Sequence, residues 1–258
     1  MFPSVSFLGL GLYSWGHILA GIIGLLFSIW YAKKCRISLE KAFLLVAWII
    51  PSIFLTMYIV SLVDGSNWSK GAKASIFMPA IICLLCTVLN LSFTKALDFL
   101  IPCFTLAHGF AHIFCIFPGC CRGYPCSFGI WNERQQDYLF PVQLFESATY
   151  LLIFCYMVWY AKKKKYKTRG ISYGQYFFLF GLTQAFWEFF KDNTEQRWQI
   201  STFQYYSFAA FLIGLIWLGV AFYLQKHPEF VKKHELLFRE DVGELTRIKM
   251  FLRKRRNK

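Results

Sequence analysis

Acidic residues are scarce in this chain: Asp and Glu together number 14 of 258 residues, and all charged residues make up 16%. Hydrophobic residues make up 57%, with 29 Phe, 14 Tyr and 9 Trp among them. So many aromatic rings exceed what the core of a soluble domain of this size needs. The composition therefore excludes an ordinary soluble domain and predicts an integral membrane protein.

The beginning of the chain lacks the marks of a cleavable signal peptide. No basic region precedes the first apolar run, and no small-residue cleavage site follows it. We therefore expect this run to remain in the protein as a helix. The sequence also lacks an internal repeat and a second soluble domain, so we expect a single membrane domain over residues 1–225.

Seven runs of little or no charge have the length of about 20 residues that an α-helix needs to cross a bilayer. Helices are the expected form because a backbone in lipid must satisfy its own hydrogen bonds. The predicted fold is an all-α integral membrane protein with seven transmembrane helices. The expected spans are residues 12–31, 43–63, 75–93, 99–117, 144–161, 171–190 and 205–224.

The 28 Lys and Arg residues give the chain a net charge of +14, and they are distributed unevenly along it. If the N-terminus lies outside, 22 of them fall on the inner side, within residues 33–41, at Lys95, within 162–169 and after residue 225. Cytoplasmic segments of membrane proteins carry such an excess. We therefore predict an outer N-terminus and a cytoplasmic C-terminus, and we assign the charge to membrane topology and not to a nucleic-acid partner.

Residues 226–258 differ in kind from the rest of the chain. Phe238, Val242, Leu245, Ile248 and Leu252 recur at helical spacing among basic residues. This pattern predicts a basic cytoplasmic tail that forms an amphipathic helix on the anionic membrane surface. A disordered basic tail with the same electrostatic role is the alternative.

Few residues within the expected spans can titrate near neutral pH. Carboxylates are costly at membrane depth, so Glu146 and Glu188 are the first candidates for a functional site. Glu146 also begins a helix, where the helix dipole favours an anion, so a structural hydrogen bond is the alternative for it. His108 and His112 lie one helical turn apart and are the other candidates for catalysis.

Histidines and cysteines between residues 108 and 126 raise the question of a metal site or a disulfide. His108, His112 and Cys115 share one helical face, but no acidic residue accompanies them and no CxxC pair follows. We therefore expect no metal and no cofactor, and interpret the face as a polar cavity. One disulfide could form on the outer side, and the sequence does not choose its partners among Cys115, Cys120, Cys121 and Cys126.

Five segments occur in an order that points to a known family. They are LGLGLYSWGHILAGIIG (8–24), ALDFLIPCFTLAHGFAHIFCIFPGCCRGYP (96–125), PVQLFE (141–146), FWEFFKDN (186–193) and STFQ (201–204). Together they resemble, from end to end, the prolipoprotein diacylglyceryl transferase family, and in particular a branch with a Gly-Cys-Cys motif. The five segments in this order are a specific signal of the family, whereas a single segment is a weak one.

The resemblance implies a seven-helix enzyme of the bacterial cytoplasmic membrane. Such an enzyme transfers the diacylglyceryl group of phosphatidylglycerol, or of a similar anionic phospholipid, to a cysteine thiol in the signal-peptide region of a lipoprotein precursor, and releases glycerol phosphate. The resemblance adds to Glu146 and Glu188 a set of substrate-site residues that this chain keeps: Gly119, Gly123, Gln143 and Gln204.

This chain departs from the family at two arginines, which are replaced by His112 and Gln184; Trp15 and Met78 also replace family residues. By its position, Gln184 stays a candidate for substrate binding. Loss of two guanidinium groups removes a bidentate phosphate clamp. In an active divergent transferase, the phosphate would then be bound by protonated His112 or by one of Arg122, Lys191 and Arg197. His108 or a carboxylate would take the thiol proton.

Two alternatives remain open from the sequence. The chain could keep the fold and a phospholipid cavity while its catalysis is altered or lost. A different class of function would be a metal-dependent or thiol-redox membrane protein that uses His108, His112 and the cysteines.

Overall fold

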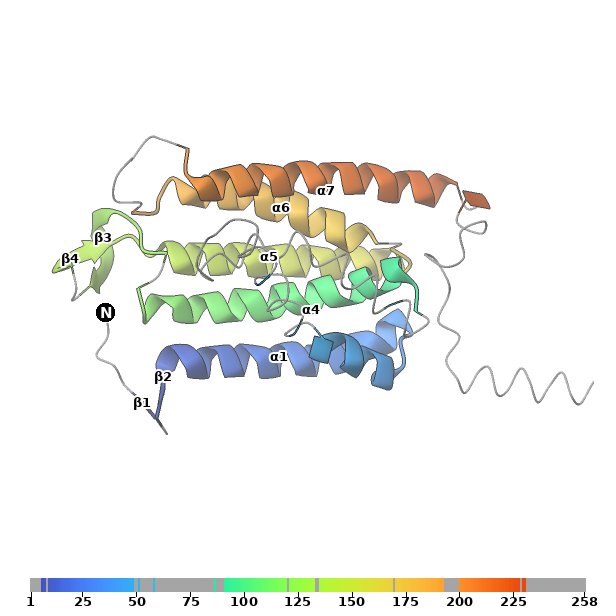
Figure 1. Cartoon of the computed structure of the whole chain (residues 1–258), viewed down its shortest axis with the longest axis horizontal. Helices are drawn as coiled ribbons and strands as arrows, with labels where there is room; N and C mark the ends of the chain where they lie inside the picture. Colours follow the sequence, from blue (N-terminus) through green and yellow to red (C-terminus); the bar gives the residue numbers. More distant parts are fainter. Residues whose placement is uncertain are drawn as a thin grey trace, which may run out of the picture.

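Long helices make up most of the described part of the protein, with short strand pairs at one end (Figure 1). This computed structural model describes residues 6–7, 9–48, 51, 58, 86, 91–119, 121–132, 135–168, 170–192, 200–227 and 229–230. The long helices are α1 (Leu12–Cys35), α4 (Phe93–Ile113), α5 (Val142–Lys163), α6 (Ile171–Glu188) and α7 (Thr202–Lys226). A 3-10 turn, η1 (Phe114–Ile116), follows α4 directly.

Four helical stretches are long and apolar enough to cross a membrane: Leu12–Cys35, Phe93–Ile116, Val142–Lys163 and Phe203–Lys226. They confirm a multi-pass membrane protein and four of the expected spans, although α4 begins six residues earlier than predicted. The expected span 171–190 forms the 18-residue helix α6, which is not among these four. Residues 39–48 are helical, and most of the expected spans 43–63 and 75–93 lies outside the described residues.

The helices pack in sequence order, with α4 between α1 and α5 and with α6 against α7 (Figure 1). The contact between α6 and α7 is the most extensive of these. At Gly181 and Gly214 a Cβ atom would meet backbone atoms of the opposite helix. Glycines at these positions therefore let the two backbones approach closely, as small residues do at helix contacts in membranes.

A buried carboxylate joins two helices at the end of the bundle where α4 and α6 begin. The side chain of Asp98 on α4 accepts hydrogen bonds from the backbone N–H groups of Gly170 (2.6 Å) and Ser172 (3.0 Å). These N–H groups lie at the start of α6, where backbone N–H groups have no hydrogen-bond partners within the helix. Asp98 therefore acts as the N-terminal cap of α6 from a different helix.

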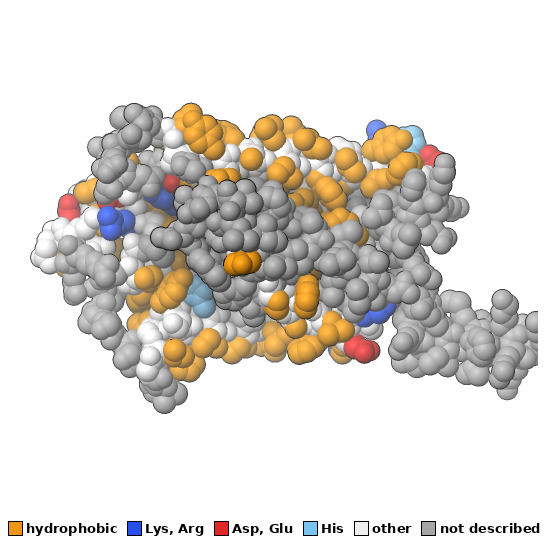
Figure 2. Space-filling model, in the orientation of Figure 1, with side chains coloured by type: hydrophobic (Ala, Val, Ile, Leu, Met, Phe, Trp, Pro, Cys, Tyr) orange, Lys and Arg blue, Asp and Glu red, His pale blue; other side chains and the backbone are white. Residues whose placement is uncertain are grey.

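Basic residues gather at this same end of the bundle. They include Lys33, Lys34, Lys162, Lys163 and Lys226, which stand in the last turns of α1, α5 and α7. Figure 2 shows charged side chains near both ends of the molecule, with hydrophobic side chains along the edges between them. The arrangement supports the predicted orientation, which stays a prediction, as does the tail helix, since residues 231–258 lie outside the described residues.

Two strand pairs lie at the opposite end, and the expected all-α fold did not include them. Strands β1 (Ser6–Phe7) and β2 (Leu10–Gly11) are antiparallel, and so are β3 (Pro125–Asn132) and β4 (Asp137–Leu139). The β3–β4 hairpin has a register shift between Pro125 and Ile130. The fold is therefore mostly helical, with a hairpin inserted between α4 and α5 on the side predicted to face outward.

Candidate functional site

Four charged or titratable side chains meet near the hairpin end of the bundle, and we call them the polar centre: His112, Glu146, Glu188 and Lys191. His112 Nε2 lies 2.6 Å from Glu146 Oε2. The Lys191 ammonium lies 2.8 Å from Glu146 Oε1 and 3.0 Å from Glu188 Oε2. Glu146 is fully buried and Lys191 is 8% exposed, so these ions interact in surroundings that screen them weakly.

Three different segments supply these side chains. His112 stands in the last turn of α4, Glu146 in the second turn of α5, and Glu188 at the end of α6. The helix dipole favours the Glu146 anion near the start of α5, but it disfavours the Glu188 anion at the end of α6. Lys191, three residues beyond Glu188, compensates the unfavourable position.

The loop between η1 and β3, described at residues 117–119 and 121–124 and here called the signature loop, holds the Lys191 backbone in place. Gly123 forms an isolated antiparallel bridge with Lys191, and the amide of Asp192 donates to the carbonyl of Arg122 at 2.9 Å. The Arg122 side chain completes the link through Nε, 3.2 Å from Asp192 Oδ2. A side chain at Gly123 would collide with the backbone oxygen of Phe140. The loop therefore passes too close to Phe140, just before α5, for any residue but glycine at position 123.

Glu188 is also tied to the start of α7. The Ser201 hydroxyl donates to Glu188 Oε1 at 3.1 Å and accepts from the amide of Gln204. The Gln204 side-chain oxygen in turn accepts from the amide of Ser201 at 2.8 Å, which completes a capping box. Gln204 thus supports the site by fixing the start of α7. Its side-chain nitrogen, Nε2, donates to the backbone carbonyl of Ala185.

The charges of the polar centre do not cancel when His112 is neutral. Burial of Lys191 acts to lower its pKa, but the neighbouring side chains of Glu146, Cys121 and Glu188 outweigh burial and raise this pKa above its usual value. Lys191 is therefore a cation across the physiological range. Two carboxylates against one ammonium leave one surplus negative charge, which repels an anionic substrate unless another cation joins the centre.

A second group of polar side chains lies deeper between α4, α5 and α6. The Tyr150 hydroxyl donates to Gln184 Oε1 at 2.6 Å, and the Tyr150 ring stacks on His108 with 4.5 Å between ring centroids. His108 Nδ1 is buried, and no described residue forms a hydrogen bond with it. The rings of His108 and His112 are 5.8 Å apart, so this group adjoins the polar centre.

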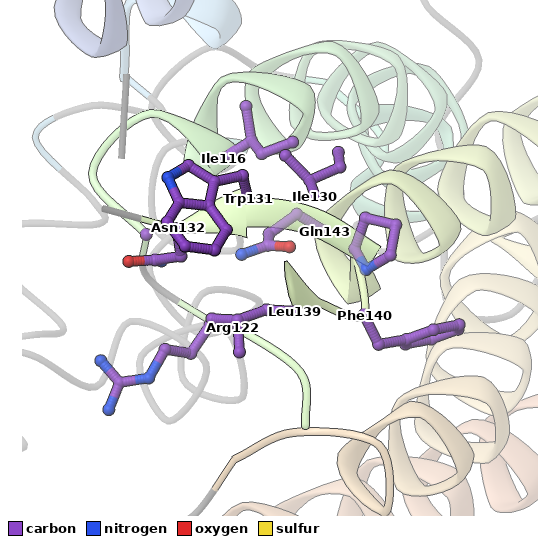
Figure 3. Close-up of a pocket in the computed structure, with 10 residues that line it drawn as sticks. Ile116, Arg122, Ile130, Trp131, Asn132, Leu139, Phe140 and Gln143 are labelled. Carbon is purple, nitrogen blue, oxygen red and sulfur yellow. The ribbon is translucent and has the colours of Figure 1, made fainter. Parts of the chain in front are cut away.

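A pocket opens between the signature loop and the hairpin (Figure 3), and no residue of the polar centre lines it. Gly119, Arg122 and Gln143 contribute to its lining. Figure 3 shows Gln143 beside Ile130 and Trp131, whereas the guanidinium group of Arg122 extends away from them. Arg122 pairs with Asp192 and lies outside the polar centre, so its position does not favour the predicted role in binding phosphate within that centre.

Three potential ligand atoms for a metal ion converge at the polar centre. They belong to His112, Cys121 and Glu146, and all lie within 4.8 Å of one another. The other ring nitrogen of His112, Nδ1, is 3.6 Å from the Cys115 sulfur. Cys121 has a positive φ of 55°, and this turn places it next to residues that lie far away in sequence. No disulfide joins the described Cys115, Cys121 and Cys126 to one another.

The structure thus brings together most of the residues singled out in the sequence. His112, Glu146, Glu188 and Lys191 are in contact; Gln204 is connected through Ser201; His108 and Gln184 form the adjoining group. Arg197 lies outside the described residues. Sequence reasoning gave no role to Tyr150, Ser201 or Asp192, although Tyr150 follows Glu146 by one helical turn and this spacing could have identified it.

Comparisons with known proteins agree on one family. A family model described as prolipoprotein diacylglyceryl transferase matches residues 70–220. The chain is 29% identical over 140 residues to a phosphatidylglycerol–prolipoprotein diacylglyceryl transferase of Clostridium tetani, which covers 51% of this chain and 55% of that protein. It is 27% identical over 127 residues to a second such transferase, of Clostridium perfringens. That match covers 46% of this chain and 49% of the relative. The chain matches about half the length of these curated relatives.

Proposed function

Since this chain belongs to the prolipoprotein diacylglyceryl transferase family, we propose that it transfers a diacylglyceryl group from phosphatidylglycerol to a cysteine thiol of a lipoprotein precursor. The reaction releases glycerol phosphate. The observation that carries the proposal is the polar centre, in which ionised groups of three segments are buried at the hairpin end of otherwise apolar helices. Burying ionisable groups among apolar helices is energetically costly. Such groups therefore indicate a functional site.

The place of the centre fits the two substrates. Its end of the bundle is opposite the basic end, so in the predicted topology it faces the outer leaflet of a bacterial cytoplasmic membrane. A phospholipid headgroup lies at that depth, and the signal-peptide region of a lipoprotein precursor emerges there. The seven spans, the outer N-terminus and the cytoplasmic tail at 226–258 are part of this proposal.

Roles within the centre follow from its contacts. Glu146 and His112 share one short hydrogen bond and together form the candidate acceptor for the thiol proton. Lys191 is the described cation nearest to both carboxylates, and we assign it to the charge that develops on the departing phosphate. Gln143, on the turn before Glu146, lines the pocket through which a headgroup would reach these residues.

A second function is favoured by one observation. Gln184 stands where the family has an arginine, and its oxygen is engaged by Tyr150. A phospholipid-binding protein of this fold with lost catalysis would need no phosphate clamp there. The transferase proposal keeps precedence because both carboxylates of the centre and their lysine are in contact.

Rescue of bacteria depleted of their own transferase tests the proposal. Cells that express this chain should accumulate diacylglyceryl-modified lipoprotein precursor, detected by mass spectrometry of a reporter lipoprotein. E146Q should abolish the modification, whereas C155S, a change at an exposed position of α5 away from the centre, should retain it. Absence of modified precursor despite normal levels of the protein in the membrane would refute the transferase function and leave the phospholipid-binding alternative.

A further inference from the structure

Three atoms of the kind that bind zinc converge at the polar centre, which also holds two carboxylates for one ammonium group. Glu146 binds the Lys191 ammonium through Oε1, so its other oxygen, Oε2, can bind a second positively charged partner. His112 presents Nε2 to that same oxygen, and the Cys121 thiol completes the group. One imidazole, one thiolate and one carboxylate form a ligand set typical of zinc.

We propose that His112, Cys121 and Glu146 bind one Zn²⁺ ion whose open fourth position receives the acceptor thiol. The inference rests on the transferase function proposed above and deepens it. It differs from the metal face considered in the sequence, because Cys121 and Glu146 replace His108 and Cys115 as partners of His112.

The distances allow such an ion with small movements. Zinc bonds of about 2.0 to 2.3 Å place tetrahedral ligand atoms roughly 3.3 to 3.8 Å apart. The three atoms already lie within 4.8 Å of one another, and the 2.6 Å contact of His112 with Glu146 would open as the ion entered. Side-chain rotations of three residues at a loop and two helix ends can provide these shifts.

Neighbouring groups orient the ligands as metal sites require. Lys191 holds the second oxygen of Glu146 at 2.8 Å, and the Cys115 sulfur faces Nδ1 of His112 at 3.6 Å. When the ion is bound through Nε2, His112 carries its proton on Nδ1, and the Cys115 sulfur is placed to accept it. The charges also balance: the ion offsets the Cys121 thiolate and the surplus carboxylate, while Lys191 offsets the other.

The chemistry of the transfer gives this ion a specific task. A thiolate is the competent nucleophile, and a thiol that binds zinc loses its proton. Since His112 and Glu146 bind the ion in this arrangement, water at the outer face takes the proton in their place. Its sulfur then forms a bond to the terminal glyceryl carbon while the bond from that carbon to the phosphate oxygen breaks. The electron pair leaves with glycerol phosphate, nothing is oxidised or reduced, and the ion stays bound to the protein. Activation of the thiol by zinc would thus offset the loss of the family arginine at His112.

Metal binding can be measured without any lipid substrate. The purified full-length protein should contain about one zinc per chain, and the metal-free protein should bind Co²⁺ with the near-ultraviolet absorption of a sulfur-to-cobalt charge transfer. C121S should remove that absorption, and C121S, H112A and E146Q should each weaken binding by more than about tenfold. C155S is the matched control and should bind as the parent does. Absence of stoichiometric metal, or equal binding by C121S, would overturn the site.

The transfer assay then separates the two proposals. Vesicles of phosphatidylglycerol and phosphatidylcholine, with a precursor peptide, should yield modified peptide only when the protein holds zinc. An equal rate with metal-free protein would overturn the role of the ion and leave the transferase function intact. Stoichiometric zinc in a protein that modifies no precursor, in vesicles or in depleted cells, would instead refute the transferase function and the thiol activation that rests on it.

Discussion

The ammonium group of Lys191 and the carboxylate of Glu146 form a buried ion pair at 2.8 Å, with both side chains almost completely excluded from solvent. Lys191 also reaches Glu188 at 3.0 Å, so one cation joins the start of α5 to the end of α6. Burial of either carboxylate alone would be costly, because a charge removed from water needs a partner. The position of the site therefore depends on a residue that belongs to no helix.

Replacement of Lys191 by Met should strongly destabilise the protein. The change leaves Glu146 and Glu188 buried side by side without their shared cation, which costs about 3 to 5 kcal/mol for a buried pair. Unfolding by sodium dodecyl sulfate in mixed micelles would measure the loss. K162M, at an exposed position of the basic end, should leave the transition unchanged.

A double variant tests whether that loss comes from the ion pairs. In K191M/E188Q one of the two orphaned charges is removed, so the combined destabilisation should be smaller than the sum of the two single changes. Simple additivity of the two effects would show that Lys191 does not act through Glu188.

Much of this arrangement follows from the sequence, and the rest depends on contacts between distant segments. Scarce charge at membrane depth identifies Glu146 and Glu188, and helical spacing identifies His108 and His112. The spacing of three residues places Lys191 near Glu188. No local pattern reveals that Lys191 also reaches Glu146, because its position is set by pairing of the signature loop with the segment after α6.

The hairpin illustrates the same limit. In the β3–β4 ribbon Trp131 pairs with Tyr138, and Gly129 lets the two strands approach closely. Hydropathy alone treats this stretch as a loop between spans. The approach of Cys121 to His112 was equally hidden, since it needs the left-handed turn at Cys121 and the folded position of α5. These groups come together only in the folded chain.

Asp98 should contribute to stability through the start of α6. D98N keeps the size of the side chain but replaces one acceptor oxygen with an N–H₂ group, which faces a backbone N–H donor of Gly170 or Ser172. Leaving one buried donor unsatisfied should cost about 1 to 3 kcal/mol. The same unfolding measurement applies, with E40Q as an exposed control; a D98N protein as stable as the parent would contradict the capping role.

Two glycines of α7 should respond in opposite directions to the same substitution. A Cβ at Gly214 would collide with the Phe178 backbone, so G214A should separate α6 from α7 and destabilise the protein by about 1 to 3 kcal/mol. A Cβ at Gly219 meets nothing within 4 Å, and G219A should stabilise the helix by up to about 1 kcal/mol. Unfolding of the two variants side by side checks the difference in sign.

Replacement of His112 by Arg should uncouple the transfer from metal. Arginine can donate to Glu146 as His112 does, and the resembling family has an arginine here, but a guanidinium group has no lone pair with which to bind an ion. H112R should therefore bind no stoichiometric zinc and show transfer at a reduced rate that chelators no longer affect, whereas H112A should lose both. Transfer by H112R that still depends on zinc would contradict the assignment of His112 as a ligand. Complete inactivity of a folded H112R protein would contradict the prediction that arginine at this position supports transfer without the ion.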